Sequence, residues 1–247
     1  MSQKIKKEIY EIKVLLNSVP TIIFSFFILT LFVMNLLANK SLNIPVLWLK
    51  LDAGYIISWL LFLIMDVLTK HFGPKAATTI SILATLINLV LCFVLFIASI
   101  LPGMWGEAFV AGSESVINTA LDKTFGGTWY VILGSTVAFI VSSICNNFTN
   151  YAIGMGFKKN PNSFFAYITR SYLSTAVGQF VDNLTFSMLV GHIFFGWSFI
   201  HCLLSAAICM FIELICEAVF SPIGYRICQK WQEENVGTEY FKLVKKR

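Results

Sequence analysis

Four acidic residues lie within long apolar stretches of this 247-residue chain: Asp66, Asp182, Glu213 and Glu217. A carboxylate inside hydrocarbon costs about 2.5–3.5 kcal/mol on insertion scales, so acids in such stretches usually serve a function. A buried carboxylate accepts hydrogen bonds and binds cations or protons. Each of the four is therefore a candidate ligand for a polar solute or an ion.

Asp182 is the strongest candidate because it lies near the middle of its apolar stretch and a polar stripe runs through it. Steps of three and four residues place on one helix face Ser171, Thr175, Gly178, Asp182 and Thr185. Gln179 and Asn183 flank that face and offer amide donors and an acceptor. Ser and Thr often only join helices to one another, so we expect them to be packing contacts and Asp182 to be functional.

The other acids are less distinct. Asp66 is either a second ligand or the partner of Lys70, four residues further on, and the sequence leaves both open. Glu217 is expected nearer the membrane surface, where it can reach water. Glu213 is predicted to point into the helix bundle, because it shares a helix face with Cys202, Ala206, Cys209 and Cys216.

A weak internal sequence repeat, called the internal echo below, adds Asn146 to the candidate ligands. An offset of 36 residues aligns 135–149 with 171–185 and pairs Asn146 with Asp182. In both segments, and at Asp66, an acid or amide is followed three residues later by Thr. Transporters often derive from repeats with a binding site at the repeat interface, so the echo favours solute transport. A chance match of four residues is the alternative.

The composition requires lipid around these residues. Hydrophobic residues make up 57% of the chain and charged residues 13%, far from the balance of a soluble domain. About 20 apolar residues span a bilayer as a helix. The sequence predicts an all-α integral membrane protein, a single membrane domain over 1–247 with a bundle of six transmembrane helices at about 19–38, 54–69, 76–101, 129–153, 164–194 and 198–223.

The basic residues predict the orientation of the spans. Of the 18 Lys and Arg residues, all but Lys40, Lys50 and Lys123 fall on one side of the predicted membrane. Because Lys and Arg are retained on the cytoplasmic side, both termini are expected in the cytoplasm. The net charge of +5 is then a topology signal, and no nucleic-acid partner is expected.

The predicted outer loop, Pro102 to Gly127, is long enough to contain structure of its own. Ser113 is a suitable N-cap and Gly126 a suitable end for a short helix lying on the outer surface. A solvated loop is an equally acceptable interpretation.

Other function classes find little support. No Gly-x-x-x-x-Gly-Lys-Ser/Thr motif is present, and no Ser/His or His/Glu arrangement has catalytic spacing, so we expect no enzyme and no cofactor. The six cysteines lie within or at the edges of spans and predict neither a disulfide framework nor a metal site.

Several segments resemble the queuosine precursor transporter family, also called the vitamin-uptake-like (VUT) family of bacterial six-span proteins. Asp66-Val-Leu-Thr-Lys-His-Phe-Gly73 resembles the family's Asp-x-Leu-Thr-Glu-x-Tyr-Gly signature. Gly178-Gln-Phe-Val-Asp182-Asn-Leu-Thr-Phe186, preceded by Arg170, resembles Gly-Gln-x-x-Asp-Thr-x-x-Phe. Glu107-Ala108-Phe109 and Ser135 to Phe139 also fall where the family has similar residues.

This resemblance implies import of a small-molecule substrate, a 7-deazaguanine such as 7-cyano-7-deazaguanine or a similar purine-like solute, across the bacterial cytoplasmic membrane. We expect Asp182 to be the principal ligand and Asp66 a second ligand or coupling site. The further substrate-binding candidates are Gln179, Asn183, Asn146 and Glu213. A rival interpretation is the substrate-capturing subunit of an ATP-driven vitamin importer. A homo-oligomer and energising ATPase subunits both stay open as partners.

Overall fold

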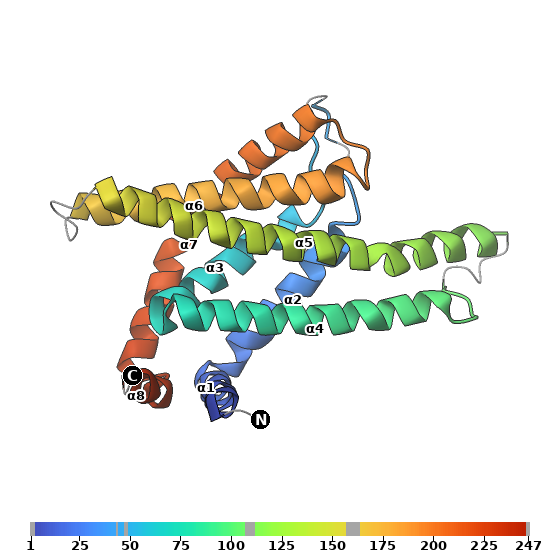
Figure 1. Cartoon of the computed structure of the whole chain (residues 1–247). Coiled ribbons are helices and arrows are strands. Elements are labelled where there is room, and N and C mark those ends of the chain that lie inside the picture. Colours follow the sequence, from blue (N-terminus) through green and yellow to red (C-terminus); the bar gives the residue numbers. More distant parts are fainter. Residues whose placement is uncertain (1–2, 43, 47–48, 107–111, 157–163, 246–247) are drawn as a thin grey trace. The chain divides into compact units, whose positions relative to one another are not determined.

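The computed structural model describes residues 3–42, 44–46, 49–106, 112–156 and 164–245, and these residues are almost entirely helical. Within them the only β-type contact is an isolated bridge between Ser41 and Asp52. The helices, coloured along the chain in Figure 1, are α1 (Gln3–Ser18), α2 (Thr21–Leu37), α3 (Tyr55–Phe72), α4 (Pro74–Ile100), α5 (Glu114–Gly156), α6 (Phe164–Phe186), the π-helix η2 (Ser187–His192), α7 (Phe199–Glu233) and α8 (Thr238–Lys245). The expected all-α class is therefore confirmed.

Several helices are suited to a membrane. Among the described residues, four helices are long and apolar enough to span one: α3, α4, α5 and α7. A fifth span arises if α1 and α2, bent by 101° at their junction, are counted together. Helix α6 is not among these spans, and it carries the polar residues Gln179, Asp182 and Asn183. The sixth span and the cytoplasmic placement of both termini stay predictions.

The chain divides into two compact units. Unit 1 contains Met1–Met34, Ile56–Leu91 and Cys216–Arg247, and unit 2 contains Asn35–Tyr55 and Cys92–Ile215. The two candidate aspartates consequently belong to different units, Asp66 to unit 1 and Asp182 to unit 2.

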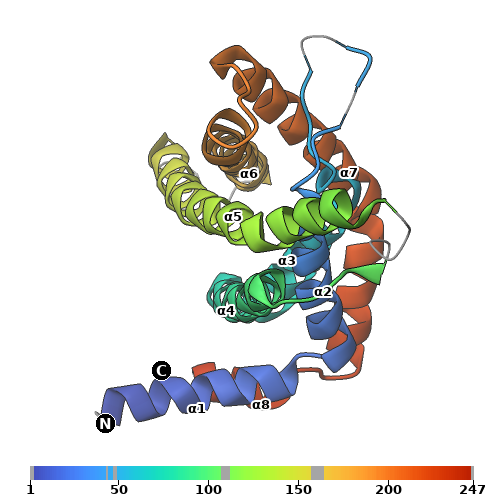
Figure 2. The ribbon, with the colours of Figure 1, turned by 90° about the vertical axis from the view of Figure 1, so that its right-hand side faces the viewer.

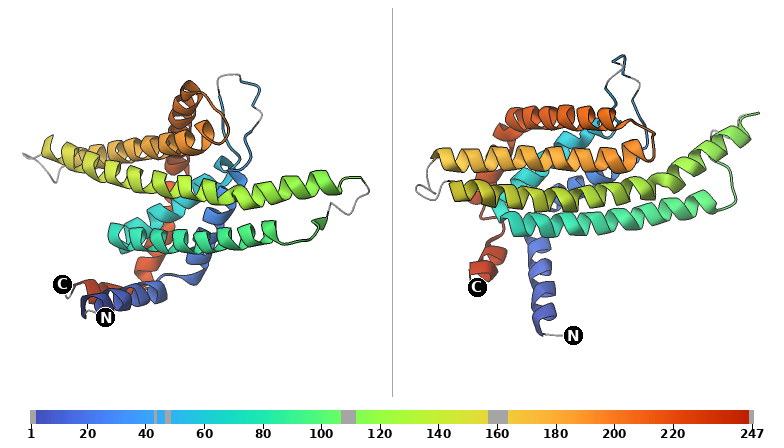
Figure 3. Two further views of the ribbon diagram at one scale, coloured as in Figure 1. Left: turned by 45° about the vertical axis from the view of Figure 1, so that its right-hand side comes forward. Right: turned by 45° about the horizontal axis from the view of Figure 1, so that its top comes forward.

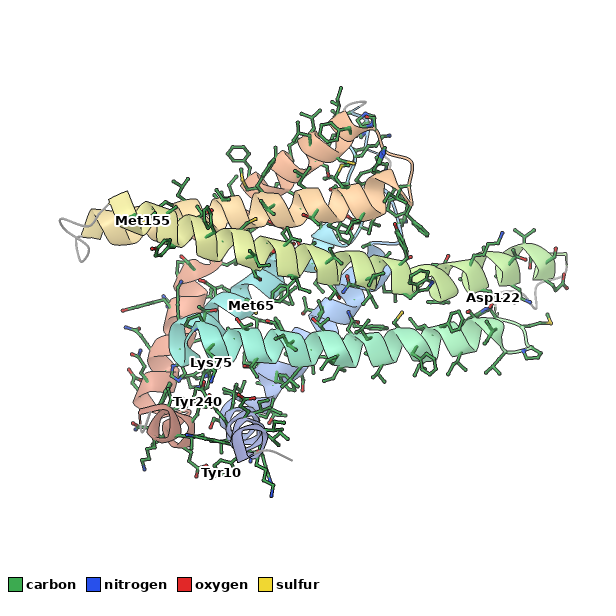
Figure 4. The ribbon with its side chains drawn as sticks, in the orientation of Figure 1. Tyr10, Met65, Lys75, Asp122, Met155 and Tyr240 are labelled. Carbon is green, nitrogen blue, oxygen red and sulfur yellow. The ribbon has the colours of Figure 1, made fainter. Side chains whose placement is uncertain are left out.

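Unit 1 packs its apolar side chains around the C-terminal half of α3. Leu68 is fully buried there, and the cluster around it includes Phe27, Ile80 and Trp231. Helices α1 and α8 lie against each other in this unit (Figure 2). Glu11 of α1 accepts a hydrogen bond from Lys75 Nζ at the start of α4, at 2.5 Å; Lys75 is labelled in Figure 4. This ion pair fixes the basic first helix to the unit.

Unit 2 is organised by the antiparallel pair α5 and α6, which run side by side in both views of Figure 3. Their contacts keep one register, in which a step of four or eight residues along one helix matches an equal step back along the other. The facing pairs are Tyr130 with Phe194, Gly134 with Val190, Ser142 with Asp182, and Asn146 with Gly178. The small residues Gly134, Ser142 and Gly178 let the two backbones approach closely.

The prediction of a short, separate outer helix that ends at Gly126 is wrong. Helix α5 begins at Glu114, beside Ser113 as predicted, but continues through Gly126 and Gly127 to Gly156. A Cβ atom on Gly126 would lie 2.6 Å from Ser99 Oγ, so this glycine allows a close approach between helices instead of ending one. Helix α7 likewise passes through Pro222 and ends ten residues after the predicted limit at residue 223.

Replacing Gly134 by alanine is expected to destabilise unit 2 by about 1–3 kcal/mol. The new Cβ would lie 2.6 Å from Cγ2 of Val190, whose β-branched side chain is fully buried and has little room to move. Thermal unfolding in detergent measures the effect. Gly156→Ala at the end of the same helix is the matched control, because nothing lies within 4 Å of its Cβ position. Equal melting temperatures for the two variants would contradict this packing.

Candidate functional site

Asp182 faces α5 from the middle of the α5–α6 interface. Ser142 Oγ donates a hydrogen bond of 2.8 Å to Asp182 Oδ1. One turn away, Asn146 packs against Gly178, whose hypothetical Cβ would lie 3.1 Å from that of Asn146. The polar stripe predicted on α6 therefore meets a stripe of small and polar residues on α5.

Asn183 connects residues of unit 2 that come from three different helices. The hydroxyl of Tyr55, at the first residue of α3, donates to Asn183 Oδ1 at 3.0 Å. Asn183 Nδ2 donates to Glu213 Oε2 of α7 at 2.8 Å and to the Gln179 carbonyl at 3.0 Å. Both amide hydrogens and one acceptor position are thus already used. Asn183 is placed to hold its neighbours in position.

Glu213 is buried, with 3% of its surface exposed. The helix face that the sequence predicted to point inward is confirmed at Cys202, Ala206 and Cys209, which are fully buried, whereas Cys216 is half-buried. Glu213 is also close enough to Asp182 for the two carboxyl groups to repel each other. The structure therefore brings both acids into one neighbourhood of unit 2.

No cation neutralises these acids within the described part of the chain. The ion pairs found there all lie in unit 1 and join Asp66 to Lys70, Glu11 to Lys75, and Glu234 to Lys230. Burying two carboxylates without a counter-ion is costly. The neighbourhood therefore favours a proton, a cation or a ligand that donates hydrogen bonds.

Two nearby amide oxygens also lack donors. Gln179 Oε1 and Asn146 Oδ1 are buried without a hydrogen-bond partner in the described structure. Gln179 is 7% exposed and lies one turn before Asn183 on α6. Because unpaired buried acceptors are costly, these two oxygens are suited to accept a hydrogen bond from water or from the N–H or O–H group of a ligand. The four acceptors Asp182, Glu213, Gln179 and Asn146 make up what we call the acceptor cluster.

Asp66 lies in a different setting. Lys70 Nζ donates to Asp66 Oδ2 at 2.5 Å, so the ion pair that the sequence left open is formed. Glu217 is half-buried and within electrostatic range of both partners. These three charged residues form a group of their own in unit 1.

Sequence reasoning missed Tyr55 and Ser142 as members of the site. Tyr55 is 128 positions from Asn183, and no local pattern indicates that they meet. Ser142 could have been found from its place in the internal echo, where it aligns with Gly178. Glu107-Ala108-Phe109 lies outside the described residues, and the side chain of Arg170 is likewise outside them.

Asp52, which precedes α3, is a third buried acid of unit 2 and was not predicted. Its Oδ1 accepts a 2.8 Å hydrogen bond from the Gly54 backbone N–H, and 4% of its surface is exposed. Burial raises the pKa of Asp52 to about 7, although the Gly54 N–H acts in the opposite direction. This carboxyl group therefore changes charge near neutral pH.

Replacing Asp52 by asparagine is expected to stabilise the protein above pH 7. The folded carboxyl group has its pKa raised from 3.8 to about 7, so the wild type loses stability as pH rises through that interval. Asparagine keeps the acceptor for Gly54 and does not ionise. The difference should be absent at low pH and on the order of 4 kcal/mol above pH 7. Melting temperatures of the wild type and of Asp52→Asn, measured across this pH range, test the prediction. If the difference between them did not change with pH, burial would not raise the pKa of Asp52.

The comparison with protein families decides what kind of molecule carries this cluster. A family model described as "Putative vitamin uptake transporter" matches residues 52–227, well over half of the chain. The chain belongs to the vitamin uptake transporter family. The matched region contains the whole acceptor cluster as well as the Asp66–Lys70 pair. No curated protein and no solved structure matches the chain.

Membership confirms the resemblance found in the two aspartate motifs. Family membership and the apolar helices together identify this member of the vitamin uptake transporter family as a multi-pass membrane protein. The acceptor cluster is then a candidate solute site inside a membrane protein, where polar ligands need partners because lipid offers none.

Proposed function

We propose that this protein imports a purine-like solute, a 7-deazaguanine precursor of queuosine such as 7-cyano-7-deazaguanine. The observation that carries the proposal is the acceptor cluster, which contains two carboxyl groups and two unpartnered amide oxygens and no described cation. A guanine-like ring presents adjacent N–H donors, which a carboxylate accepts as a pair. The hydrogen-bond acceptors of the cluster thus match the N–H donors of the ring.

Asp182 is the principal ligand in this proposal. One of its oxygens accepts from Ser142, and a carboxylate has capacity for further donors. Gln179 Oε1 and Asn146 Oδ1 accept other N–H groups of the solute. Asn183 has its amide hydrogens engaged by Glu213 and the Gln179 carbonyl, so it supports the site instead of contacting the solute.

Thermal-shift measurements on the purified protein test the substrate class. A ligand that binds only the folded state stabilises it by about 2.7 kcal/mol at a hundred times its dissociation constant. We expect 7-cyano-7-deazaguanine to raise the melting temperature, purines to do so less, and water-soluble vitamins not at all. If only a vitamin raised the melting temperature, the proposed substrate would be wrong and that vitamin would take its place.

The rival function is the substrate-capturing subunit of an ATP-driven vitamin importer, which the wording of the matched family model favours. The chain carries no phosphate-binding loop of its own, so an ATPase would have to be a separate subunit. Co-purification of an ATPase and a coupling membrane protein supports this rival. Uptake by the purified chain alone in liposomes excludes it.

The proposed setting is the bacterial cytoplasmic membrane, crossed six times with both termini inside. The distribution of Lys and Arg supports this orientation. A reporter that is active only in the cytoplasm, fused to the C-terminus, should be active. If that reporter were inactive, and a reporter that is active only in the periplasm were active at the same C-terminus, the predicted orientation would be wrong.

A further inference from the structure

A line of hydrogen-bonded side chains crosses unit 2 and ends on Glu213. The Tyr55 hydroxyl donates to Asn183 Oδ1 at 3.0 Å, and Asn183 Nδ2 donates to Glu213 Oε2 at 2.8 Å. The Asn183 amide is held from both ends, because its other hydrogen is bonded to the Gln179 carbonyl. The Glu213 carboxyl group is thus fixed in position by residues of α3 and α6.

The groups that face Glu213 are acidic or neutral. Besides Asn183, they are Asp182 from α6, Tyr55 from the start of α3, and Cys209 from its own helix. Asp52 acts on the same Tyr55 hydroxyl. Lys40 is exposed, and its backbone carbonyl accepts from the Ala53 N–H. No ion pair between these acids and a cation occurs in the described residues.

The neighbouring amide provides an independent sign of a bound donor. Gln179 Oε1 is buried and has no partner among the described residues. The backbone carbonyl of the same residue and Glu213 Oε2 both accept hydrogen bonds from Asn183 Nδ2. A ligand N–H can donate to this oxygen. For Glu213 itself, deep burial without a paired cation among the described residues favours the neutral form.

We propose that Glu213 is a proton-binding site that couples uptake of the solute to inward movement of a proton, with Asn183 as its positioning residue. The inference rests on the proposed function for its transport step. When the site faces the outer water, a hydronium ion gives its proton to a Glu213 oxygen, and water is left behind. When the site faces the cytoplasm, the O–H bond breaks and water takes the proton.

The coupling follows from the charges of the two acids. Two neighbouring carboxylates without a cation cannot both stay ionised at reasonable cost. Asp182 is half-buried and accepts from Ser142, whereas Glu213 is almost fully buried. The proton therefore resides on Glu213 and leaves Asp182 charged for the N–H donors of the solute. The loaded transporter carries one proton with each solute molecule.

The test uses Glu213→Gln, which keeps the shape and the acceptor for Asn183, beside Glu233→Gln, an exposed residue of the same helix. Infrared spectra of the purified protein, titrated without any solute, should show a band of a buried protonated carboxyl group. All spectra are taken in the Asp52→Asn background, because Asp52 itself titrates near neutral pH. In that background we expect Glu213→Gln to remove the band and Glu233→Gln to keep it. A band that survives there in Glu213→Gln, or no titrating band there at all, would overturn the proton site.

Transport is measured in liposomes that enclose a pH-sensitive dye, with external 7-cyano-7-deazaguanine as the probe. The wild type should acidify the interior as the probe enters. Glu213→Gln should lose about tenfold or more of that proton influx, whereas Glu233→Gln should acidify the interior like the wild type. Uptake by the wild type without acidification would overturn the coupling. If no probe enters but Glu213→Gln removes the infrared band, the proton site stands and the proposed substrate is wrong.

Discussion

Asp182→Asn is expected to reduce solute binding about 10–100-fold while the protein still folds. Asparagine keeps an oxygen that accepts the 2.8 Å hydrogen bond from Ser142, so the α5–α6 interface is preserved. The variant loses the negative charge, and with it the stronger hydrogen bonds that a carboxylate makes to the N–H donors of a solute. Binding measured by thermal shift and uptake measured in liposomes should fall together.

Asp122→Asn is the matched control for this experiment. Asp122 accepts a hydrogen bond from Trp105 Nε1 at 2.9 Å and is on α5 as well, labelled in Figure 4. Asparagine can accept that bond equally, so binding should be unchanged. If Asp182→Asn bound and transported like the wild type at unchanged stability, Asp182 would not be a ligand.

Asn183→Asp is expected to cause the largest loss of stability, about 3–5 kcal/mol at neutral pH. A carboxylate at this position cannot donate to Glu213 Oε2 or to the Gln179 carbonyl, which are bonded at 2.8 and 3.0 Å in the wild type. It would also place a second negative charge in the buried neighbourhood of Asp182. Melting temperatures should fall more at high pH than at low pH, because protonation removes the repulsion.

Asn118→Asp is the control for the change in side chain. Asn118 Oδ1 accepts the Trp105 backbone N–H at 2.9 Å, and a carboxylate accepts the same bond. Its stability should therefore stay within about 0.5 kcal/mol of the wild type, as for other tolerated surface changes. A pH-independent loss for Asn183→Asp would show that packing, and not charge, explains its effect.

Parts of this site could be read from local patterns. Steps of three and four residues correctly placed Glu213 on the buried face of its helix, because one helical turn fixes which side chains share a side. The same steps put Asp182 on the polar stripe that meets α5. The pairing of Asp66 with Lys70 was one of two open interpretations, since both residues lie on one helix within one turn.

Helix ends were less predictable. Gly126 was interpreted as the end of a short helix and residue 223 as the limit of the last span, yet both lie inside long helices. A glycine inside a helix costs about 1 kcal/mol, and close packing can outweigh that amount. Here the missing side chain of Gly126 leaves the space that Ser99 occupies. The sequence shows the local preference but not the neighbour that overrides it.

The sequence by itself determined the helical membrane class, the family through the two aspartate motifs, and the inward face of Glu213. Each of these depends on composition or on residues within a few turns of one another. Only the tertiary structure decided that Tyr55, Asn183 and Glu213 join in one line, and that Ser142 meets Asp182. Those contacts join residues 30–128 positions apart, and their register depends on how small residues let α5 and α6 approach. Packing between distant segments, which no local periodicity encodes, therefore made a functional site from isolated polar residues.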